Sequence, residues 1–351
     1  GSFKNQNQIS IINNKEKTTI ETKNTIISTG SEPVSLRGIE FDEEKILSST
    51  GALSISKLPK KMIVVGGGYI GLEMGSVWSR LGTEVQVIEF LDHITPGMDK
   101  EISTEFMKIL KKQGIKFELK TKVEKITKSK NGVIIETFSK EGKKNKFEAD
   151  VVLISVGRKP YTKNLNLEKI GVELDKRGSV KVNKNFQTNI KNIYAIGDVI
   201  EGPMLAHKAE EEGIAVAELI SGQSGHVNYD TIPSVVYTSP EVASIGKTEE
   251  QLKGKGIKYK IGKFPFSANS RAKAIDESEG FVKILADSTT DKVLGVHIIG
   301  QHAGEMIAEM SVAMEFGASS EDIARTCHAH PTFSEAIKEA ALSVEKRQIH
   351  S

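Results

Sequence analysis

The sequence predicts an α/β protein, and three observations support this fold class. An apolar run, Met62–Val65, passes directly into a group of glycines and then into a helical pattern that ends near Leu81. Residues 1–37 carry short runs in which apolar and polar residues alternate, which indicates strands with no helix between them. Residues 226–351 carry strand-like runs followed by two helical stretches, which is typical of an α+β domain. A chain of 351 residues is long enough for two or three such domains.

The patterns divide the chain into four expected parts, in the order 1–37, 38–157, 158–225 and 226–351. Periodicity predicts helices over residues 69–81, 99–113, 205–220, 303–316 and 334–344. It predicts strands near residues 8–12, 18–20, 24–27, 62–65, 85–89, 150–156, 192–196, 234–237, 258–264, 281–286 and 293–299. The dipeptides Asn131-Gly132 and Glu141-Gly142 mark hairpin turns between further strands of the second part.

Composition excludes several classes of function. The net charge is +2 with 27% charged residues, so there is no electrostatic footprint for nucleic acid. We find no apolar stretch long enough to span a bilayer and no signal peptide. A single cysteine, Cys327, rules out a disulfide within the chain and favours a reducing, cytoplasmic location.

The glycines after the first long apolar run have the spacing of a dinucleotide-binding turn, G-x-G-x-x-G. This motif is weak alone, but here it follows a strand and opens a helix, as a Rossmann-type unit requires. Gly66 permits the tight turn, Gly68 lets the backbone approach a pyrophosphate, and Gly71 lets the helix pack closely on the strand. The helix N-terminus then offers free N–H groups and its positive dipole end to the anion. The alternative is a purely structural glycine turn in an α/β unit.

A carboxylate, Glu89, ends the next apolar run about 20 residues after the glycines. We expect it to accept hydrogen bonds from the adenosine ribose and to repel a 2′-phosphate, so NAD is preferred over NADP. Glu73 follows in the helix and is interpreted from its position as a first-turn acid that complements the helix dipole. Tyr69 in the same turn is interpreted from the sequence as a core residue.

The segment Cys327–Glu335 contains an imidazole and a carboxylate five residues apart, on either side of a proline. Such spacing lets His330 meet Glu335, which fixes the tautomer of the ring and raises its basicity. The alternatives are an ordinary histidine at a helix start and a metal site built from Cys327, His328 and His330. We expect no metal site, because no second ligand pair stands elsewhere at a fixed spacing.

Two further features have both a functional and a structural interpretation. Asp198 follows a glycine at the end of an apolar run, where a carboxylate reaches a ligand or caps a following helix. Met306, Met310 and Met314 lie at i, i+4 spacing and are interpreted as helix core or as a dimer contact.

Taken together, these motifs resemble the flavoprotein disulfide reductases, and most closely the dihydrolipoamide dehydrogenases. The segments that carry the resemblance are Ser28–Ser31, Gly66–Glu73, Ser155–Arg158, Tyr194–Asp198, Met204–His207 and Cys327–Glu335. The resemblance implies that NAD contacts Gly66, Gly67, Gly68, Tyr69, Ile70, Gly71, Glu73, Glu89, Val123 and Gly157. It implies that FAD contacts Thr29, Gly30, Ser31, Asp198, Met204, Leu205, Ala206 and His207. It also makes His330 the catalytic base and Glu335 its orienting partner.

The resemblance implies an activity as well as a set of contacts. The family passes electrons from dihydrolipoamide to a disulfide, then to FAD, and then as hydride to NAD. The substrate is carried on the lipoyl domain of a 2-oxoacid dehydrogenase complex. The C-terminal part forms a homodimer in which each His-Glu pair completes the partner's site. The four parts of the chain are then a remnant of an FAD domain, an NAD domain, a second FAD-domain segment and an interface domain.

The sequence departs from the family at its start. A complete member opens with its own glycine-rich FAD fold and a Cys-x4-Cys redox disulfide, and neither is found here. We therefore expect a chain that lacks roughly its first hundred residues and is colourless and inactive alone. The alternatives are a non-catalytic, NAD-binding, dimer-forming fragment and an NADPH-dependent relative such as glutathione or mercuric reductase.

Overall fold

The computed structural model describes residues 1–14 and 16–351, and these residues form two compact units. The first unit combines Gly1–Val34 with Gly157–Val227. The second combines Ser35–Val156 with Asn228–Ser351. Each unit is therefore built from two separate stretches of sequence.

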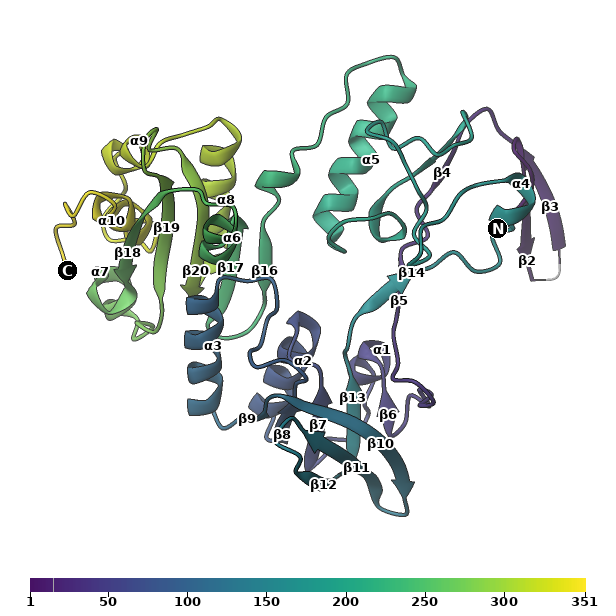
Figure 1. Cartoon of the computed structure of the whole chain (residues 1–351), viewed down its shortest axis with the longest axis horizontal. Helices are drawn as coiled ribbons and strands as arrows, with labels where there is room; N and C mark the ends of the chain where they lie inside the picture. Colours follow the sequence, from purple (N-terminus) through teal and green to yellow (C-terminus); the bar gives the residue numbers. More distant parts are fainter. Residues whose placement is uncertain (15) are drawn as a thin grey trace. The chain divides into compact units, whose positions relative to one another are not determined.

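The first unit is made of small sheets and one long helix (Figure 1). β1, β2 and β3 form an antiparallel sheet, β5 pairs antiparallel with β14, and β4 pairs parallel with β15. A core that includes Ile27, Ile193 and Val216 joins the β4–β15 pair to helix α5. The elements of this unit are β1 (Ser2–Asn5), β2 (Gln8–Asn13), β3 (Glu16–Glu21), β4 (Thr25–Ile27), β5 (Ser31–Pro33), β14 (Arg158–Pro160), α4 (Leu167–Ile170), β15 (Ile193–Ala195), the 3-10 turn η1 (Gly197–Val199) and α5 (Ala206–Ile220).

A five-stranded parallel sheet forms the N-terminal half of the second unit, with strand order β6-β13-β7-β8-β9. Two of the interior strands, β7 and β13, are almost fully buried, which explains why Met62–Val65 and Val151–Ile154 read as continuous apolar runs. The elements are β6 (Ile46–Leu47), α1 (Ser49–Leu53), β7 (Lys61–Val65), α2 (Tyr69–Arg80), β8 (Glu84–Ile88), α3 (Lys100–Lys112), β9 (Lys116–Glu118) and β13 (Val151–Ile154).

A three-stranded antiparallel sheet is inserted between β9 and β13. Its strands are β10 (Thr121–Ser129), β11 (Gly132–Ser139) and β12 (Lys144–Ala149). Both turns fall where Asn131-Gly132 and Glu141-Gly142 predict them. Ile135 and Ala149 pack with strands of the parallel sheet, so this insertion shares the core of the nucleotide-binding half.

The C-terminal half of the second unit is a five-stranded antiparallel sheet with strand order β16-β17-β20-β19-β18. Its elements are η2 (Tyr229–Thr231), β16 (Ser234–Val236), β17 (Glu241–Gly246), α6 (Glu249–Gly254), β18 (Tyr259–Pro265), η3 (Phe266–Ala268), α7 (Ser270–Ala274), β19 (Phe281–Asp287), β20 (Val293–Gly300), α8 (Ala303–Glu315), α9 (Ser320–Arg325) and α10 (Glu335–Ser343).

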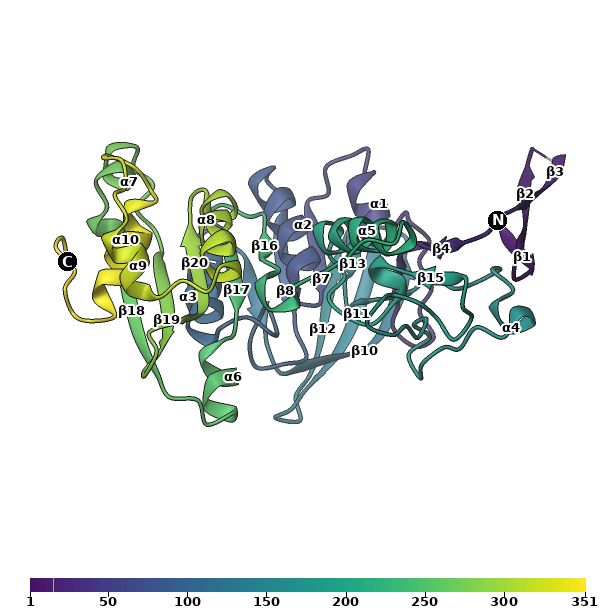
Figure 2. The same ribbon diagram turned by 90° about the horizontal axis from the view of Figure 1, so that it is seen from above.

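Both faces of this antiparallel sheet are covered. Helices α8 and α10 pack on one face, where Val282 and Ile298 are cross-strand partners in the core (Figure 2). The opposite face carries Phe281 and Ile299, which pack with the core of the nucleotide-binding half beside α3. Burial on both sides explains why β19 and β20 read as continuous apolar runs rather than as alternating ones.

The predicted fold class is confirmed, and the long predicted helices begin and end within one residue of the observed ones. Met306, Met310 and Met314 are buried in the core under α8, so their interpretation as helix core is confirmed. Periodicity does not predict α1, α6, α7 and α9, because five or six residues are too few to show an apolar stripe. Among the described residues, no helix combines the length and the apolar character needed to cross a membrane.

Candidate active and cofactor-binding sites

The glycine turn between β7 and α2 is shaped by close approaches that only glycine allows. Gly66 has a φ of +108°, and a Cβ there would lie 2.4 Å from the carbonyl oxygen of Ser155. A Cβ on Gly71 would lie 2.3 Å from the carbonyl oxygen of Gly66. Gly68, in contrast, faces open space, with nothing within 4 Å of where its Cβ would be. The turn is therefore closed toward the protein and open toward a ligand.

The N-terminus of α2 lies at the open side of this turn. The helix has 12 residues, begins at Tyr69 and has Gly68 as its N-cap, with no side chain bonded to the cap. The first backbone N–H groups of a helix have no intrahelical partner, and the helix dipole adds partial positive charge. Gly68, Tyr69 and Ile70 thus form a surface suited to a pyrophosphate.

Glu89 lies directly beside the glycine turn and is 8% exposed. Its Oε2 accepts the N–H of Gly67 at 2.6 Å, and its Oε1 accepts the N–H of Leu91 at 2.8 Å. These two bonds hold the carboxylate in one orientation and leave a lone pair on each oxygen for a further donor. A ribose hydroxyl group is such a donor, whereas a phosphate is not.

Two helix residues after the turn reach the C-terminal half of the same unit. The carboxylate of Glu73 accepts the N–H of Tyr237 at 2.8 Å, and Tyr69 is hydrogen-bonded to Ser234. Burial raises the pKa of Glu73, and the Tyr237 N–H partly offsets this effect. The interpretation of Glu73 as a first-turn acid is wrong, because α2 begins at Tyr69 and Glu73 is its fifth residue.

Two further residues predicted to contact NAD, Val123 and Gly157, lie outside the glycine turn and α2 in the sequence. Val123 lies on β10, is half-buried and packs against the core shared by the two sheets. Gly157 belongs to the first unit, has a φ of +128° and accepts the N–H of Val34 through its carbonyl oxygen.

In the first unit, Asp198 is held by a short chain of hydrogen bonds. Ser31 donates its hydroxyl to Asp198 Oδ2 at 2.5 Å, and Arg158 Nε donates to that hydroxyl at 2.7 Å. Asp198 lies inside η1, whose N-cap is Ile196, so the interpretation of Asp198 as a helix cap is wrong. The carboxylate is instead held in place by the hydroxyl of Ser31.

Neighbouring residues of this unit include an open glycine position and the start of a helix. Thr29 donates its hydroxyl to the carbonyl of Tyr161 at 2.6 Å, and Gly30 has a φ of +72° with nothing within 4 Å of its Cβ position. Helix α5 begins at Ala206 and has Leu205 as an N-cap without a side-chain bond. Met204 precedes this cap and His207 follows in the first turn.

A buried ion pair that sequence reasoning missed fixes the backbone beside Asp198. Lys208 and Glu212 are 3.0 Å apart and almost fully buried. Glu212 Oε2 accepts the N–H of Gly197 at 2.6 Å, and Lys208 donates to the carbonyl of Gly197 at 3.0 Å. The sequence signal for this pair is a Lys and a Glu at i, i+4 spacing in the predicted helix 205–220. Two side chains at this spacing lie on the same helix face and can form an ion pair.

The predicted imidazole–carboxylate pair is formed in the loop before α10. His330 Nδ1 lies 2.9 Å from Glu335 Oε1, and Glu335 Oε2 accepts the N–H of Thr332 at 2.8 Å. Burial alone would raise the pKa of Glu335, but the bonds from Thr332 and His330 hold that pKa below its ordinary value. Because an ionised carboxylate only accepts, Nδ1 carries the proton and Nε2 is left as the basic nitrogen.

A second imidazole–carboxylate pair lies two residues earlier and was also missed. His328 Nε2 lies 2.8 Å from Glu309 Oε1, and its Nδ1 lies 3.0 Å from the carbonyl oxygen of Thr326. Both partners only accept hydrogen bonds, so the ring is an imidazolium in this arrangement. The bond to Glu309 accordingly raises the pKa of His328.

Comparison with protein families accounts for nearly the whole chain. Residues 2–213 match the family model of pyridine nucleotide-disulphide oxidoreductases, and residues 232–341 match the dimerisation domain of the same family. The chain belongs to the pyridine nucleotide-disulphide oxidoreductase family. The second match covers the antiparallel sheet with α8 and most of α10, so this half of the second unit is a dimerisation domain.

Named relatives within this oxidoreductase family are more than half identical to the chain over the aligned residues. It is 57% identical to a mitochondrial dihydrolipoyl dehydrogenase of Pisum sativum, a match that covers all of this chain and 70% of the pea protein. It is also 57% identical to a dihydrolipoamide dehydrogenase of Chaetomium thermophilum, again over all of this chain and 70% of the relative. The resemblance to the dihydrolipoamide dehydrogenases is thus confirmed.

Solved structures of this oxidoreductase family show the same fold. A HOCl-induced flavoprotein disulfide reductase, RclA from Escherichia coli, is 27% identical with a TM-score of 0.87, covering 96% of this chain and 76% of that one. LpdA from Mycobacterium tuberculosis is 26% identical with a TM-score of 0.87, covering 95% of this chain and 72% of that one.

The nucleotide groups that this family implies fit the donors present. The open turn at Gly68, the uncapped start of α2 and the oriented Glu89 suit the pyrophosphate and ribose of a dinucleotide. In the first unit, the Asp198 carboxylate suits the hydroxyl groups of the ribityl chain of FAD, and the start of α5 suits its isoalloxazine ring. Among the described residues, no group of three His, Cys, Asp or Glu side chains is arranged to hold a metal ion.

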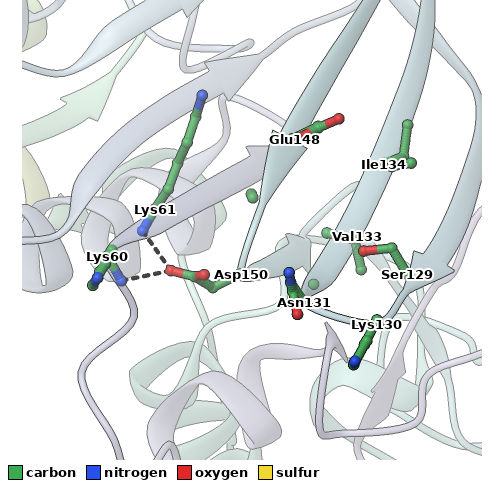
Figure 3. Close-up of a pocket in the computed structure, with 11 residues that line it drawn as sticks. Lys60, Lys61, Ser129, Lys130, Asn131, Val133, Ile134, Glu148 and Asp150 are labelled. Atoms are coloured by element: carbon green, nitrogen blue, oxygen red, sulfur yellow. Dashed lines mark hydrogen bonds between the residues drawn. The ribbon is translucent and has the colours of Figure 1, made fainter.

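One cavity lies apart from the predicted site residues. It has a volume of about 420 Å³ and opens between the start of β7 and the β10–β11 turn (Figure 3). Asp150 lines this cavity, and its carboxylate accepts the backbone N–H groups of Lys60 and Lys61, at 2.7 and 2.9 Å. Since its carboxylate is already bound to the backbone, we assign the cavity no role in the reaction.

Proposed function

We propose that the chain functions as an NAD-linked oxidoreductase of the dihydrolipoyl dehydrogenase type, converting dihydrolipoamide and NAD to lipoamide and NADH. The observation that carries this proposal is the His330–Glu335 pair, which leaves a basic imidazole nitrogen on a loop of a dimerisation domain. The names of the relatives, at 57% identity over the whole chain, support the choice of substrate.

The base would act at His330 Nε2. Glu335 holds the proton on Nδ1, so Nε2 presents its lone pair, and the side chain is 65% exposed and accessible to a thiol. Taking a proton from a substrate dithiol would generate its thiolate, the form that attacks a disulfide. The accepting disulfide would have to be supplied from outside this sequence, which has one cysteine, Cys327. Glu335 is also bonded to Thr332, so the pair keeps its orientation while the ring gains and loses the proton.

The dinucleotide would bind along the turn and the first turn of α2. The backbone N–H groups at Gly68, Tyr69 and Ile70 would hold the pyrophosphate, and Glu89 would hold the adenosine ribose. Glu73 and Tyr69 would limit the space at the nicotinamide end. We extend this proposal to the other contacts that the family implies, which are Gly66, Gly67, Gly71, Val123 and Gly157.

FAD, when bound, would relay two electrons between the dithiol–disulfide couple and NAD. Asp198 would hold its hydroxyl chain, oriented by Ser31 and by the backbone around Gly197. The other contacts that we propose for FAD are Thr29, Gly30, Met204, Leu205, Ala206 and His207.

We propose the following assignment of the chain to domains. Residues 1–37 and 158–225 would belong to an FAD domain, residues 38–157 to an NAD domain and residues 226–351 to the interface domain of a homodimer. A lipoyl domain would present the substrate. The cytoplasmic location stays a prediction that rests on the single cysteine, and the mitochondrial names of several relatives favour a mitochondrial location instead.

A second candidate function is an NAD-binding dimer without turnover. The observation that favours it is that a redox disulfide needs two thiols close together, whereas the sequence has one cysteine. Two measurements on the purified chain decide between the candidates: flavin absorbance, and NAD reduction by dihydrolipoamide. Flavin absorbance with turnover supports the enzyme, NADH binding without either supports the second candidate, and failure to bind NADH contradicts both.

A further inference from the structure

The segment between α9 and α10, which carries His330, is held on both sides of that residue. After His330, Asn269 at the start of α7 donates its side-chain amide to the carbonyl of Thr332 at 3.0 Å, and Phe333 is buried. Before His330, the segment is held by the side chain of His328, which is only 6% exposed. The exposed ring of His330 therefore lies between two anchored positions in the sequence.

His328 connects elements of the dimerisation domain through its ring. Its Nε2 lies 2.8 Å from the carboxylate of Glu309 on α8, and its Nδ1 lies 3.0 Å from the carbonyl oxygen of Thr326, the residue that caps the end of α9. The same carbonyl accepts the ammonium group of Lys338 on α10 at 2.7 Å. Because a carboxylate and a carbonyl only accept hydrogen bonds, the ring makes both bonds only as an imidazolium.

The charged groups around this ring favour the imidazolium on balance. The hydrogen bond to Glu309 raises the pKa of His328 above its ordinary value, while burial and the charge of Lys338 oppose the rise. Arg325, a cation of α9, is paired with Glu321 and is largely exposed. His328 therefore keeps its second proton at a pH where an unpaired imidazole has lost it.

His328 and His330 thus need opposite protonation states. His330 must be neutral to accept a proton at Nε2, whereas His328 must be charged to donate to both of its partners. When His328 loses a proton, one of its nitrogens becomes an acceptor that faces another acceptor, so one of the two bonds breaks. The bond between His330 and Glu335 does not involve His328, so the tautomer of His330 is kept while the segment before it loosens.

We propose that His328 is a positioning residue for the base at His330: as an imidazolium it holds the segment before His330 against α8 and α9, and it releases that segment when it loses a proton. This inference rests on the proposed function, because it takes His330 as the base. The release itself is a property of the dimerisation domain and needs no bound nucleotide. In the complete enzyme, it predicts that turnover falls again at alkaline pH, where the base is neutral but no longer held.

Amide hydrogen exchange of peptides that cover residues 326–333 measures the release directly. The exchange is followed by mass spectrometry from about pH 6 to 9 and corrected for its intrinsic dependence on pH. Protection should fall by about ten- to a hundredfold through a transition above about pH 6.5, the size expected for one hydrogen bond to a charged group. Nitrogen chemical shifts of labelled histidine should show two ring protons on His328 below this transition and one above it.

Two variants separate the release from a general loss of structure. His328→Gln has no titrating group, so protection of the segment should be low and should no longer change with pH. Glu309→Gln keeps the ring and removes its counter-charge, so the transition should move to lower pH. His93→Gln is the matched control, because His93 is paired with the neighbouring Asp92 at an exposed site outside the dimerisation domain, and it should leave protection and transition unchanged.

The outcomes distinguish this inference from the proposed function. A single ring proton on His328 at neutral pH would overturn the inference. Protection that does not change with pH, that keeps its pH dependence in His328→Gln, or whose transition stays in place in Glu309→Gln would also overturn it. A His330 ring protonated only on Nε2 in the unmodified chain would instead contradict the proposed function, because the exposed nitrogen would not be basic, and the release of the segment would still be observed.

Discussion

At the scale of single residues, Glu89 links the shape of the glycine turn to the choice of nucleotide. The backbone bonds to Gly67 and Leu91 fix its carboxylate, so its charge cannot move away from a 2′-phosphate. We expect the chain to bind NADH more tightly than NADPH. Glu89→Arg should narrow or reverse this preference, because it replaces a repulsive charge by an attractive one.

Calorimetry with both reduced nucleotides measures the preference. Asp92→Asn serves as the control, because Asp92 is an exposed carboxylate three residues later that is bonded to His93 rather than to the turn. It should leave the preference unchanged. Equal affinities of the unmodified chain for NADH and NADPH would contradict the assignment of Glu89.

The tautomer of His330 is a second property that one residue controls. Free neutral histidine carries its proton mainly on Nε2, whereas the Glu335 carboxylate requires the proton on Nδ1. Glu335→Gln should therefore shift the ring toward the Nε2-protonated form, which nitrogen chemical shifts in NMR report directly. Glu309→Gln is the control, because it removes the partner of His328 and leaves His330 paired. An unchanged His330 tautomer in Glu335→Gln would show that the pair does not set the basic nitrogen.

At the scale of secondary-structure elements, one buried carboxylate joins the two halves of the second unit. Asp99 Oδ1 accepts the N–H of Glu101 at the start of α3, and Asp99 Oδ2 accepts the N–H of Glu249 at the start of α6. Lys283 of β19 is fully buried and lies 3.0 Å from Asp99 and 2.8 Å from Glu249. Asp99 is therefore the N-cap of α3, it accepts the first N–H of α6, and its charge is paired with the ammonium group of Lys283 on β19.

Removing the ammonium group of Lys283 should lower the stability of the fold. Lys283→Met would leave the buried Asp99 carboxylate without its ammonium partner, and we expect it to lower the free energy of unfolding by about 3–5 kcal/mol. Lys263 is its cross-strand partner and pairs with Glu101 at the surface, so Lys263→Met should cost less than about 1 kcal/mol. Urea unfolding of both variants gives the comparison, and equal costs would show that burial of Lys283 has no special effect.

The same cluster predicts how stability depends on pH. Burial would raise the pKa of Glu249, but bonds from Lys253, Lys283 and Tyr259 lower it to about 2. A group with a lowered folded-state pKa stabilises the fold above its unfolded pKa and loses this effect as the pH falls through the folded value. Glu249→Gln should therefore lower the free energy of unfolding most strongly near neutral pH. The difference from the unmodified chain should shrink as the pH falls from about 4.5 to 2. A difference that stays constant over this range would contradict the ionised pair.

These elements also show how far sequence reasoning reaches. Long periodic runs such as 303–316, and the hairpin at Asn131-Gly132, are local signals, and the structure has them where they were predicted. The His330–Glu335 pair is also local, because the two residues are only five positions apart in the sequence. The Asp99–Lys283 contact joins residues 184 apart, so no pattern within one segment predicts it. The bond from the N–H of Tyr237 to Glu73 joins residues 164 apart, so it too could not be predicted from one segment.

At the scale of the whole molecule, the dimerisation domain should bring two copies together. Helix α8 buries Met306, Met310 and Met314 on its own sheet, while Val312 and Phe316 point away and are 61% and 86% exposed. Two large apolar side chains on one exposed helical face are typical of an interface rather than of a solvent-facing surface. We expect a two-fold dimer that covers this face and buries well over ~1,000 Å² in total.

Charge placed on this face should therefore separate the copies. We expect Val312→Asp combined with Phe316→Asp to shift the chain from dimer to monomer in sedimentation at micromolar concentration, because each carboxylate would be buried without a partner. The helix itself should persist, since its buried methionine face is untouched, and the far-UV circular dichroism should be unchanged. Ile349→Asp is the control, because Ile349 is 71% exposed in the C-terminal tail outside α8. A variant that remains dimeric would show that the copies meet through another face, and a monomeric unmodified chain would contradict the dimer itself.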